Sequence, residues 1–220
     1  MTMFSNVGQF GGKNGLAYSE SVFVARNATV GTGITTADTV NTFSSSAAMM
    51  TIFNSGTVSA GNNQIIVPVY LKLTAKTANT TASDFRIVGV LDKIDRYSSG
   101  GTALTSVSTA IDTRSGYTAR TPKATIYFGE LTLAATSAAK RIFTAQMSEA
   151  VLVKRESMEI WFGGAPAGAS GITNVRSVPP IWIGRGCTLS LHELANAQTA
   201  DAEFEVEFCY MEVGHPRFNS

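Results

Sequence analysis

Histidine is the base on which most nucleophilic catalysis depends, and this chain has only two. His192 lies in the segment T-L-S-L-H-E-L, whose alternation predicts a strand, and His215 lies close to the C-terminus. A hydrolytic triad also needs a nucleophile and an orienting acid, and no G-x-S-x-G sequence supplies the nucleophile. Ser137 and Lys140 form an S-x-x-K pattern without the companion motifs of that enzyme class. The sequence therefore predicts a protein that is not an enzyme.

Carboxylates are the next candidates, because they bind metals and catalyse glycoside hydrolysis. Glu203, Glu205 and Glu207 alternate along one predicted strand and so share one face. Three carboxylates at this spacing extend over about 13 Å of strand, which is too far for one cation. Histidine and cysteine do not cluster as a zinc site requires. We therefore expect no metal and no cofactor, and we assign these glutamates to an interface.

A pair of carboxylates on different strands leaves one enzymatic alternative open. Glu130, Glu156 and Glu159 fall in predicted strands, and Trp161 is close enough in sequence to stack on a sugar. A glycoside hydrolase that uses Glu130 and Glu159 is therefore one alternative. A carbohydrate- or receptor-binding domain that uses Trp161 or Trp182 is a second.

Binding to phosphate or nucleic acid is weakly supported. Gly11-Gly12-Lys13-Asn14 has the wrong glycine spacing for a phosphate-binding loop, and it lacks the Ser or Thr that binds magnesium. The chain has a net charge of +1, and its N-terminal segment is nearly uncharged. Because neutralising phosphates requires basic residues, we expect no direct contact between this segment and nucleic acid.

The two cysteines, Cys187 and Cys209, lie 22 residues apart on or beside successive predicted strands. A disulfide is geometrically possible, and two free thiols are favoured in a protein made in a cytosol. No basic and apolar leader follows Met1, and no apolar run reaches 18 residues. We therefore expect synthesis in the cytoplasm and no membrane partner.

Most of the chain between residues 48 and 213 reads as β-strand with long polar loops. Ser137–Met147 fits one or two helical turns or the entry to a strand, and Gly129 predicts a bulge. Several short alternating segments with turn residues between them are typical of a sandwich. We predict an all-β, antiparallel β-sandwich of jelly-roll type. The predicted strands are Gln64–Thr74, Phe85–Leu91, Thr125–Leu133, Glu156–Phe162, Ile181–Ile183, Thr188–Leu194 and Glu203–Val213.

In two of these strands, the alternation predicts which side chains share one face. In the last one, Phe204, Val206, Phe208 and Tyr210 are expected to face the core. In Gln64–Thr74, Pro68 indicates a sheet edge or a bulge, because proline donates no hydrogen bond. One face of that strand is expected to hold Ile65, Val67, Val69, Leu71 and Leu73.

The first sixty residues carry only four charged side chains and are rich in Gly, Ser, Thr, Asn and Ala. This composition has neither the charge of a disordered tail nor the apolar density of a core. It predicts an extended arm over residues 1–47, laid on its own domain or on a neighbouring copy. Phe4, Phe10 and Phe23 are the predicted anchors. Residues 214–220 form a short C-terminal tail.

The balance of charge supports a protein whose surface is covered by partners. Hydrophobic residues make up 44% of the chain, and charged residues make up only 15%, against about 25% in an ordinary domain. From residue 192 to 213 there are six acids and no base, whereas the rest of the chain is mildly basic. Opposite patches on identical copies can meet head to tail.

The neutral arm, the polar loops and the closing strands T-L-S-L-H-E-L and A-E-F-E-V-E-F-C-Y-M-E-V together resemble small structural proteins of tailed-phage and other virus particles. The resemblance is to head-decoration (cement), minor capsid or spike proteins with jelly-roll folds, and it concerns architecture only. It implies a capsid or capsid-decorating subunit located in the virion. Its partners would be copies of itself, as a trimer or a quasi-symmetric shell, and other virion proteins.

Overall fold

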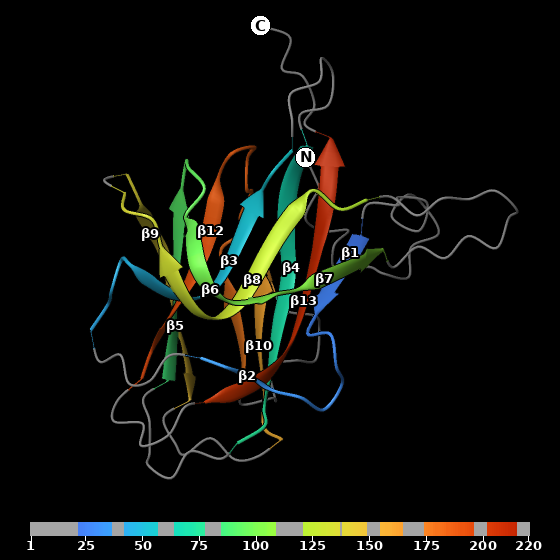
Figure 1. Ribbon diagram of the computed structural model, residues 1–220, viewed down its shortest axis with the longest axis vertical. Helices are drawn as coiled ribbons and strands as arrows, with labels where there is room; N and C mark the ends of the chain where they lie inside the picture. The colour runs from blue at the N-terminus through green and yellow to red at the C-terminus, as the bar shows by residue number, and fades with distance from the viewer. Residues whose placement is uncertain are drawn as a thin grey trace, which may run out of the picture.

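The computed structural model is all-β, with thirteen strands in two sheets that pack as a sandwich (Figure 1). This confirms the predicted fold class, while the jelly-roll assignment stays a prediction. The described part of the chain contains no α-helix, and hence none that is long and apolar enough to cross a bilayer. The structure describes residues 22–36, 42–56, 64–77, 85–108, 121–136, 138–148, 155–164, 174–195 and 202–214.

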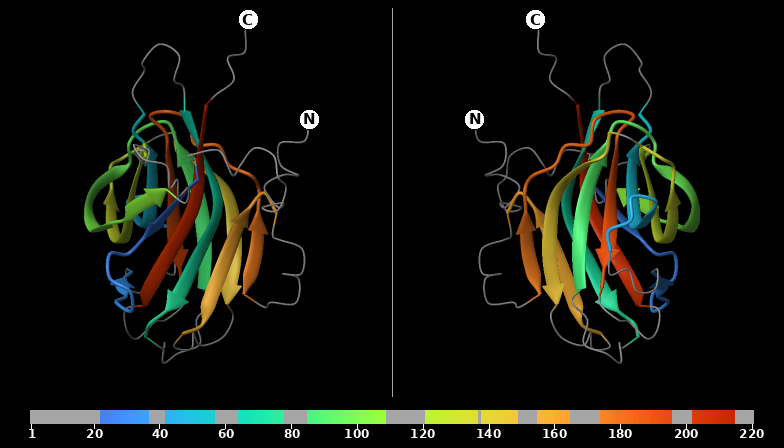
Figure 2. Two further views of the ribbon diagram at one scale, coloured as in Figure 1. Left: turned by 90° about the vertical axis from the view of Figure 1, so that its right-hand side faces the viewer. Right: turned by 90° about the vertical axis from the view of Figure 1, so that its left-hand side faces the viewer.

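The first sheet, called sheet A, has the strand order β11-β10-β4-β13-β1-β7, with β2 also paired to β13. All of its pairings are antiparallel except the parallel pairing of β10 with β11. The left view of Figure 2 faces this sheet. Its strands are β1 (Val22–Arg26), β2 (Ile34–Thr35), β4 (Gln64–Ala75), β7 (Thr105–Ser108), β10 (Ser157–Phe162), β11 (Val175–Val178) and β13 (Glu203–Gly214).

The second sheet, called sheet B, has the order β6-β8-β3-β12-β5-β9 and is antiparallel throughout. The right view of Figure 2 faces it. The predicted bulge at Gly129 is confirmed, because the register between β3 and β8 shifts there and Gly129 has a φ of 121°. The strands are β3 (Ala47–Asn54), β5 (Phe85–Asp92), β6 (Tyr97–Ala103), β8 (Ala124–Leu133), β9 (Lys140–Ser148) and β12 (Thr188–Leu194).

Most predicted strands are present within a residue or two of their expected ends. The ambiguous segment that ends at Met147 is strand β9 rather than helix. Ile181–Ile183 is an exception, because it is reduced to a single bridge between Ile183 and Ile66. Ile181 and Ile183 are nevertheless buried in the core. The segment therefore contributes its apolar side chains to the core, but its backbone does not pair as the predicted strand.

The described part of residues 1–47 pairs with the sandwich of its own chain, and the extended arm over the whole segment stays a prediction. Strands β1 and β2 lie within residues 1–47, and both are hydrogen-bonded to β13 of sheet A. Phe23 of β1 is completely buried and stacks on Tyr210 at 5.4 Å. Phe23 therefore belongs to the core of its own chain and is not an exposed anchor for a neighbour. Phe4 and Phe10 lie outside the described residues.

Strand β4 changes face at a bulge. The pairing with β13 steps from Cys209–Tyr70 to Tyr210–Pro68, which leaves Val69 as an extra residue. This confirms the bulge predicted from Pro68, although β4 is a central strand. The bulge also overturns the predicted shared face, because each extra residue reverses the alternation. Leu71 and Leu73 enter the main core with Ile66, whereas Ile65, Val67 and Val69 gather on the opposite side of sheet A.

The core between the sheets is rich in aromatic rings. Phe208 stacks on Tyr210 at 5.5 Å and meets Phe162 edge-on at 6.5 Å. Phe85 of sheet B contacts Phe204 of sheet A at 5.7 Å, so the two inner faces interlock. The inward positions predicted for β13 are confirmed, because their four side chains are 0–2% exposed.

Candidate functional site: an apolar outer face of sheet A

The most unusual surface of the described molecule is the outer face of sheet A, on the side away from sheet B. The strand register places Val22 of β1, Met211 of β13 and Val67 of β4 side by side. The next outward row contains Val24 and Cys209. We call the whole group the outer patch. Its members are Val22, Val24, Ile65, Val67, Val69, Cys209, Met211 and Val213, with Tyr70 and Trp161 packed at its border.

The outer patch is buried even though it faces away from the sandwich core. Val69 is 1% exposed, Cys209 is 5% exposed and Met211 is 6% exposed. An antiparallel sheet in a sandwich usually alternates apolar residues inside with polar residues outside. Here both faces of β13 are apolar near its C-terminal end, with Tyr210 on one side and Cys209 and Met211 on the other. Sheet A therefore carries buried apolar side chains on both of its faces in this region.

The other half of the same face is charged. The three alternating glutamates of β13 lie there half-buried, as predicted for that face. Glu207 pairs with Arg26 at 2.8 Å and accepts a 2.5 Å hydrogen bond from the Tyr70 hydroxyl. Burial, with this bond and the charge of Glu207, raises the pKa of Tyr70. Glu205 accepts a bond from the Gly31 amide and lies 3.9 Å from the Lys76 ammonium.

These glutamates are spread along the strand, and the carboxylates of Glu205 and Glu207 are paired locally. No group of three or more metal-ligating residues occurs in the described part of the chain. The role of Glu203, Glu205 and Glu207 in an interface stays a prediction.

The carboxylates considered for glycoside hydrolysis lie on different sheets. Glu130 belongs to β8 of sheet B and lines an open groove of about 650 Å³, which includes Asn27 and Thr102. Among the described residues that line this groove, Glu130 is the only titratable one. Glu159 belongs to β10 of sheet A and lies 4.0 Å from the Lys72 ammonium. The structure therefore does not bring Glu130 and Glu159 together across one cleft.

The two tryptophans have different surroundings. The Trp161 indole nitrogen donates to Glu159 at 3.0 Å, and its ring lies 5.0 Å from the Tyr70 ring. Trp161 is thus half-buried beside the outer patch, which limits the area left for stacking on a sugar. Trp182 is 42% exposed in the segment before β12. Trp161 lies in β10 and Trp182 lies in the segment before β12, so the two tryptophans belong to separate elements of the fold.

Both cysteines are free thiols. Two free thiols are the outcome that the sequence favoured over a disulfide, and synthesis in the cytoplasm stays a prediction. Cys187 lies just before β12, whereas Cys209 lies in the outer patch on β13. Burial raises the pKa of Cys209 to about 12, and the charge of Glu207 acts in the same direction. Cys209 is therefore expected to react slowly with reagents that attack thiolates.

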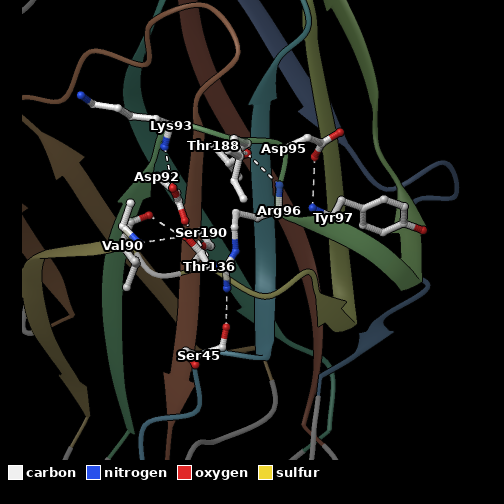
Figure 3. A network of polar contacts seen from close by, with 12 residues as sticks. Ser45, Val90, Asp92, Lys93, Asp95, Arg96, Tyr97, Thr136, Thr188 and Ser190 are labelled. Carbon is white, nitrogen blue, oxygen red and sulfur yellow. Dashed lines mark hydrogen bonds and ion pairs between the residues drawn. The ribbon is translucent and has the colours of Figure 1, made fainter.

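The outer face of sheet B carries a buried polar network that was not predicted from the sequence (Figure 3). The Arg96 guanidinium pairs with Asp92 at 3.2 Å and donates to the Ser45 carbonyl at 2.5 Å. The Arg96 amide donates to the Thr188 hydroxyl at 3.2 Å, and that hydroxyl donates to the Ile94 carbonyl at 2.7 Å. Arg96 and Asp92 are each only 2% exposed. The network fastens the 92–96 turn and the segment before β3 onto β12.

His192 extends the same polar layer. It is 3% exposed, its Nδ1 lies 2.6 Å from the Ala47 carbonyl, and its ring packs against Phe43 at 4.9 Å. Burial lowers the pKa of His192, and the Arg96 charge lowers it further, whereas bonds to the Ala47 and Ser44 carbonyls oppose the shift. The bond to a carbonyl places the proton on Nδ1. This histidine is a neutral structural residue and has no nucleophile beside it among the described contacts.

Burial of neutral His192 predicts a dependence of stability on pH. Its pKa is lower in the folded state, so the unfolded chain binds the proton more tightly. The free energy of unfolding should be level above about pH 6.5 and should fall as the pH drops below that value. Each unit of difference in pKa contributes about 1.4 kcal/mol. Urea titrations between pH 5 and 8 measure this.

The matched variants are His192→Asn and His215→Asn. His192→Asn should flatten the pH dependence between pH 5 and 7, and His215→Asn should leave it unchanged. Equal slopes in both variants would contradict the assignment to His192.

Comparison with known proteins identifies no relative of this chain. No protein family, no curated protein and no solved structure matches this chain.

Proposed function

We propose that this chain is a structural subunit of a virus particle, either the capsid protein or a protein that decorates the capsid. It works through subunit interfaces, made by the N-terminal segment and the sandwich, and not by catalysis. Its partners are further copies of itself and other virion proteins. The observation that carries the proposal is the edge of sheet A at β7, where an exposed apolar side chain ends the sheet among the described strands.

That edge is strand β7, which ends the strand order of sheet A. Val107 of β7 pairs with Val24, which in turn pairs with Cys209, so one apolar row runs from the edge into the outer patch. Val107 is 63% exposed. An exposed edge strand with an apolar side chain is a site for pairing with another chain. This supports an interface at β7.

Composition supports the same proposal. A chain with 15% charged residues is poorly suited to remain free at high concentration, and it suits a surface covered by neighbours. The setting in a virus particle rests on the resemblance of the neutral N-terminal segment and the closing strands to head-decoration proteins.

Light scattering of the purified full-length chain tests this proposal. We expect a defined oligomer, a trimer or larger, whose population grows with protein concentration. Val107→Lys should shift it toward the monomer, because a charge on the edge strand blocks pairing.

Val30→Lys is the matched control, because Val30 is 96% exposed but lies in the turn between β1 and β2. It should leave the mass unchanged. A monomer at every concentration would overturn the proposed function.

A further inference from the structure

Sheet B carries a row of basic side chains at one end of the sandwich. This is the upper end in Figure 1, where β3, β5 and β13 finish. The residues of the row come from the ends of β5, β8, β9 and β12, and all of them are exposed. We call this row the basic rim. Its members are Lys93, Lys123, Lys140, Arg141 and Arg185.

Contacts with the end of β3 hold Lys123 and Arg185 in the same row. The Ser55 amide, just after β3, donates to the Lys123 carbonyl at 3.1 Å. The Arg185 guanidinium donates through Nε to the carbonyl of the next residue, Gly56, at 2.6 Å. Because β3 lies between β8 and β12, the backbones of these two bases stand about 10 Å apart across the end of the sheet.

The same row continues over β5 and β9. Lys93 directly follows β5. Burial raises the pKa of the Cys187 thiol, and the charge of Lys93 opposes that shift, which places Lys93 near the start of β12. Lys140 begins β9 and pairs with Leu91 of β5. Since β8 and β9 are separated by β3, β12 and β5, the basic rim extends over about 19 Å.

The lysines of the basic rim are unpaired, unlike the bases on the outer face of sheet A. Lys93, Lys123 and Lys140 form no ion pair with the described residues. Figure 3 shows the Lys93 side chain pointing away from the buried polar network. Arg26 and Lys72 of sheet A, by contrast, lie 2.8 and 4.0 Å from carboxylates. The basic rim therefore has charges available to a ligand.

The acids at this end of the sandwich leave that charge largely uncompensated. Asp92 is 2% exposed and pairs with Arg96. Glu212 is 1% exposed, and its carboxylate accepts hydrogen bonds from backbone amides. Asp95 is the only exposed acid among the described residues at this end. The local charge is thus clearly positive, although the whole chain has a net charge of only +1.

We propose that the basic rim binds the phosphodiester backbone of nucleic acid, without preference for base sequence. A line of exposed lysines and arginines binds a linear polyanion because neutralising its phosphates releases their counterions. The acidic strand β13 of a second copy is a poorer occupant, because Glu205 and Glu207 are already paired with bases of their own chain. This binding goes beyond the proposed function and does not depend on it.

Fluorescence anisotropy with labelled single strands and duplexes of about 20 nucleotides tests the proposal. The association constant should fall with rising salt, with a logarithmic slope of about 0.7 per neutralised phosphate for single strands and about 0.9 for duplexes. Lys93→Gln with Lys123→Gln should reduce that slope by about 1.4 or about 1.8, respectively. The same variant should weaken binding about tenfold or more at about 50 mM salt. The form that binds more tightly identifies the source of the phosphates.

The matched control is Arg26→Gln with Lys72→Gln, which removes the same charge from the outer face of sheet A. It should leave the salt slope unchanged, because those bases are paired within the chain. Equal losses in both double variants would overturn the proposal, since only the total charge would then matter. So would the absence of binding to either form at about 50 mM salt. Equally strong competition by polyglutamate would show that the surface takes an acidic protein instead.

A second measurement uses the unaltered chain and so does not depend on the folding of a variant. Lysines are acetylated with and without the bound nucleic acid, and the rate at each position is read by mass spectrometry. Lys93, Lys123 and Lys140 should react more slowly in the complex, whereas Lys72 and Lys76 should react at the same rate. Protection confined to lysines outside the basic rim would overturn the proposal. Both readouts differ from the oligomer mass, so the proposed function can fail while this binding holds.

Discussion

Replacing Asp92 by alanine is expected to lower the free energy of unfolding by about 3–5 kcal/mol. The reason is that the guanidinium of Arg96, whose side chain is 3% exposed, would stay buried without its counter-charge. The Asp92 carboxylate also accepts a 2.7 Å bond from the Lys93 amide, which would be lost in the same variant. Urea unfolding followed by tryptophan fluorescence measures the loss.

The control removes both charges together. Asp92→Leu with Arg96→Met leaves no buried charge unpaired, and it should cost much less than Asp92→Ala alone. If the double variant is as unstable as the single one, the effect lies in packing rather than in the ion pair. A loss below about 1 kcal/mol for Asp92→Ala would show that the pair is solvated in solution.

Phe23→Ala is expected to lower the free energy of unfolding by about 3–5 kcal/mol, as for other buried phenylalanines. Phe23 is 0% exposed and packs against Tyr210 at the centre of the core. The matched control is Phe43→Ala, because Phe43 is 42% exposed and lies on the outer side of sheet B against His192. Its removal should cost about 1 kcal/mol. Thermal unfolding of both variants provides the comparison.

This comparison also separates two roles for Phe23. A core residue changes the stability of each folded chain, whereas an anchor for a neighbour changes the mass of the assembly. If Phe23→Ala leaves the stability intact and lowers the oligomer mass, Phe23 acts on a neighbouring copy, contrary to its position in β1.

The strands that the sequence revealed are those with an unbroken period of two. In β13 every second residue from Phe204 to Tyr210 is apolar, and the alternation continues without a bulge. β12 was likewise predicted with its observed ends, at Thr188 and Leu194. Such patterns are local, because successive side chains of a strand point to opposite faces whatever the strand pairs with.

Strands β1 and β2 were not predicted, because their segment is short of apolar residues and rich in Gly and Thr. The five residues of β1 gain their stability from pairing with β13 on one side and β7 on the other. Those partners lie about 80 residues or more away in sequence, so no local pattern reveals them. The same holds for the buried network, since the sequence shows Asp92 and Arg96 as ordinary charged residues of a turn.

The amino-acid sequence by itself determined that this is an all-β sandwich with a low content of charged residues, because alternation and composition are local properties. Only the tertiary structure decided which faces of the strands are covered. A single extra residue at Val69 reverses the facing of β4 and carries Ile65 and Val67 to the outer side. Register is a property of two strands together, and here it places apolar side chains on both faces of sheet A.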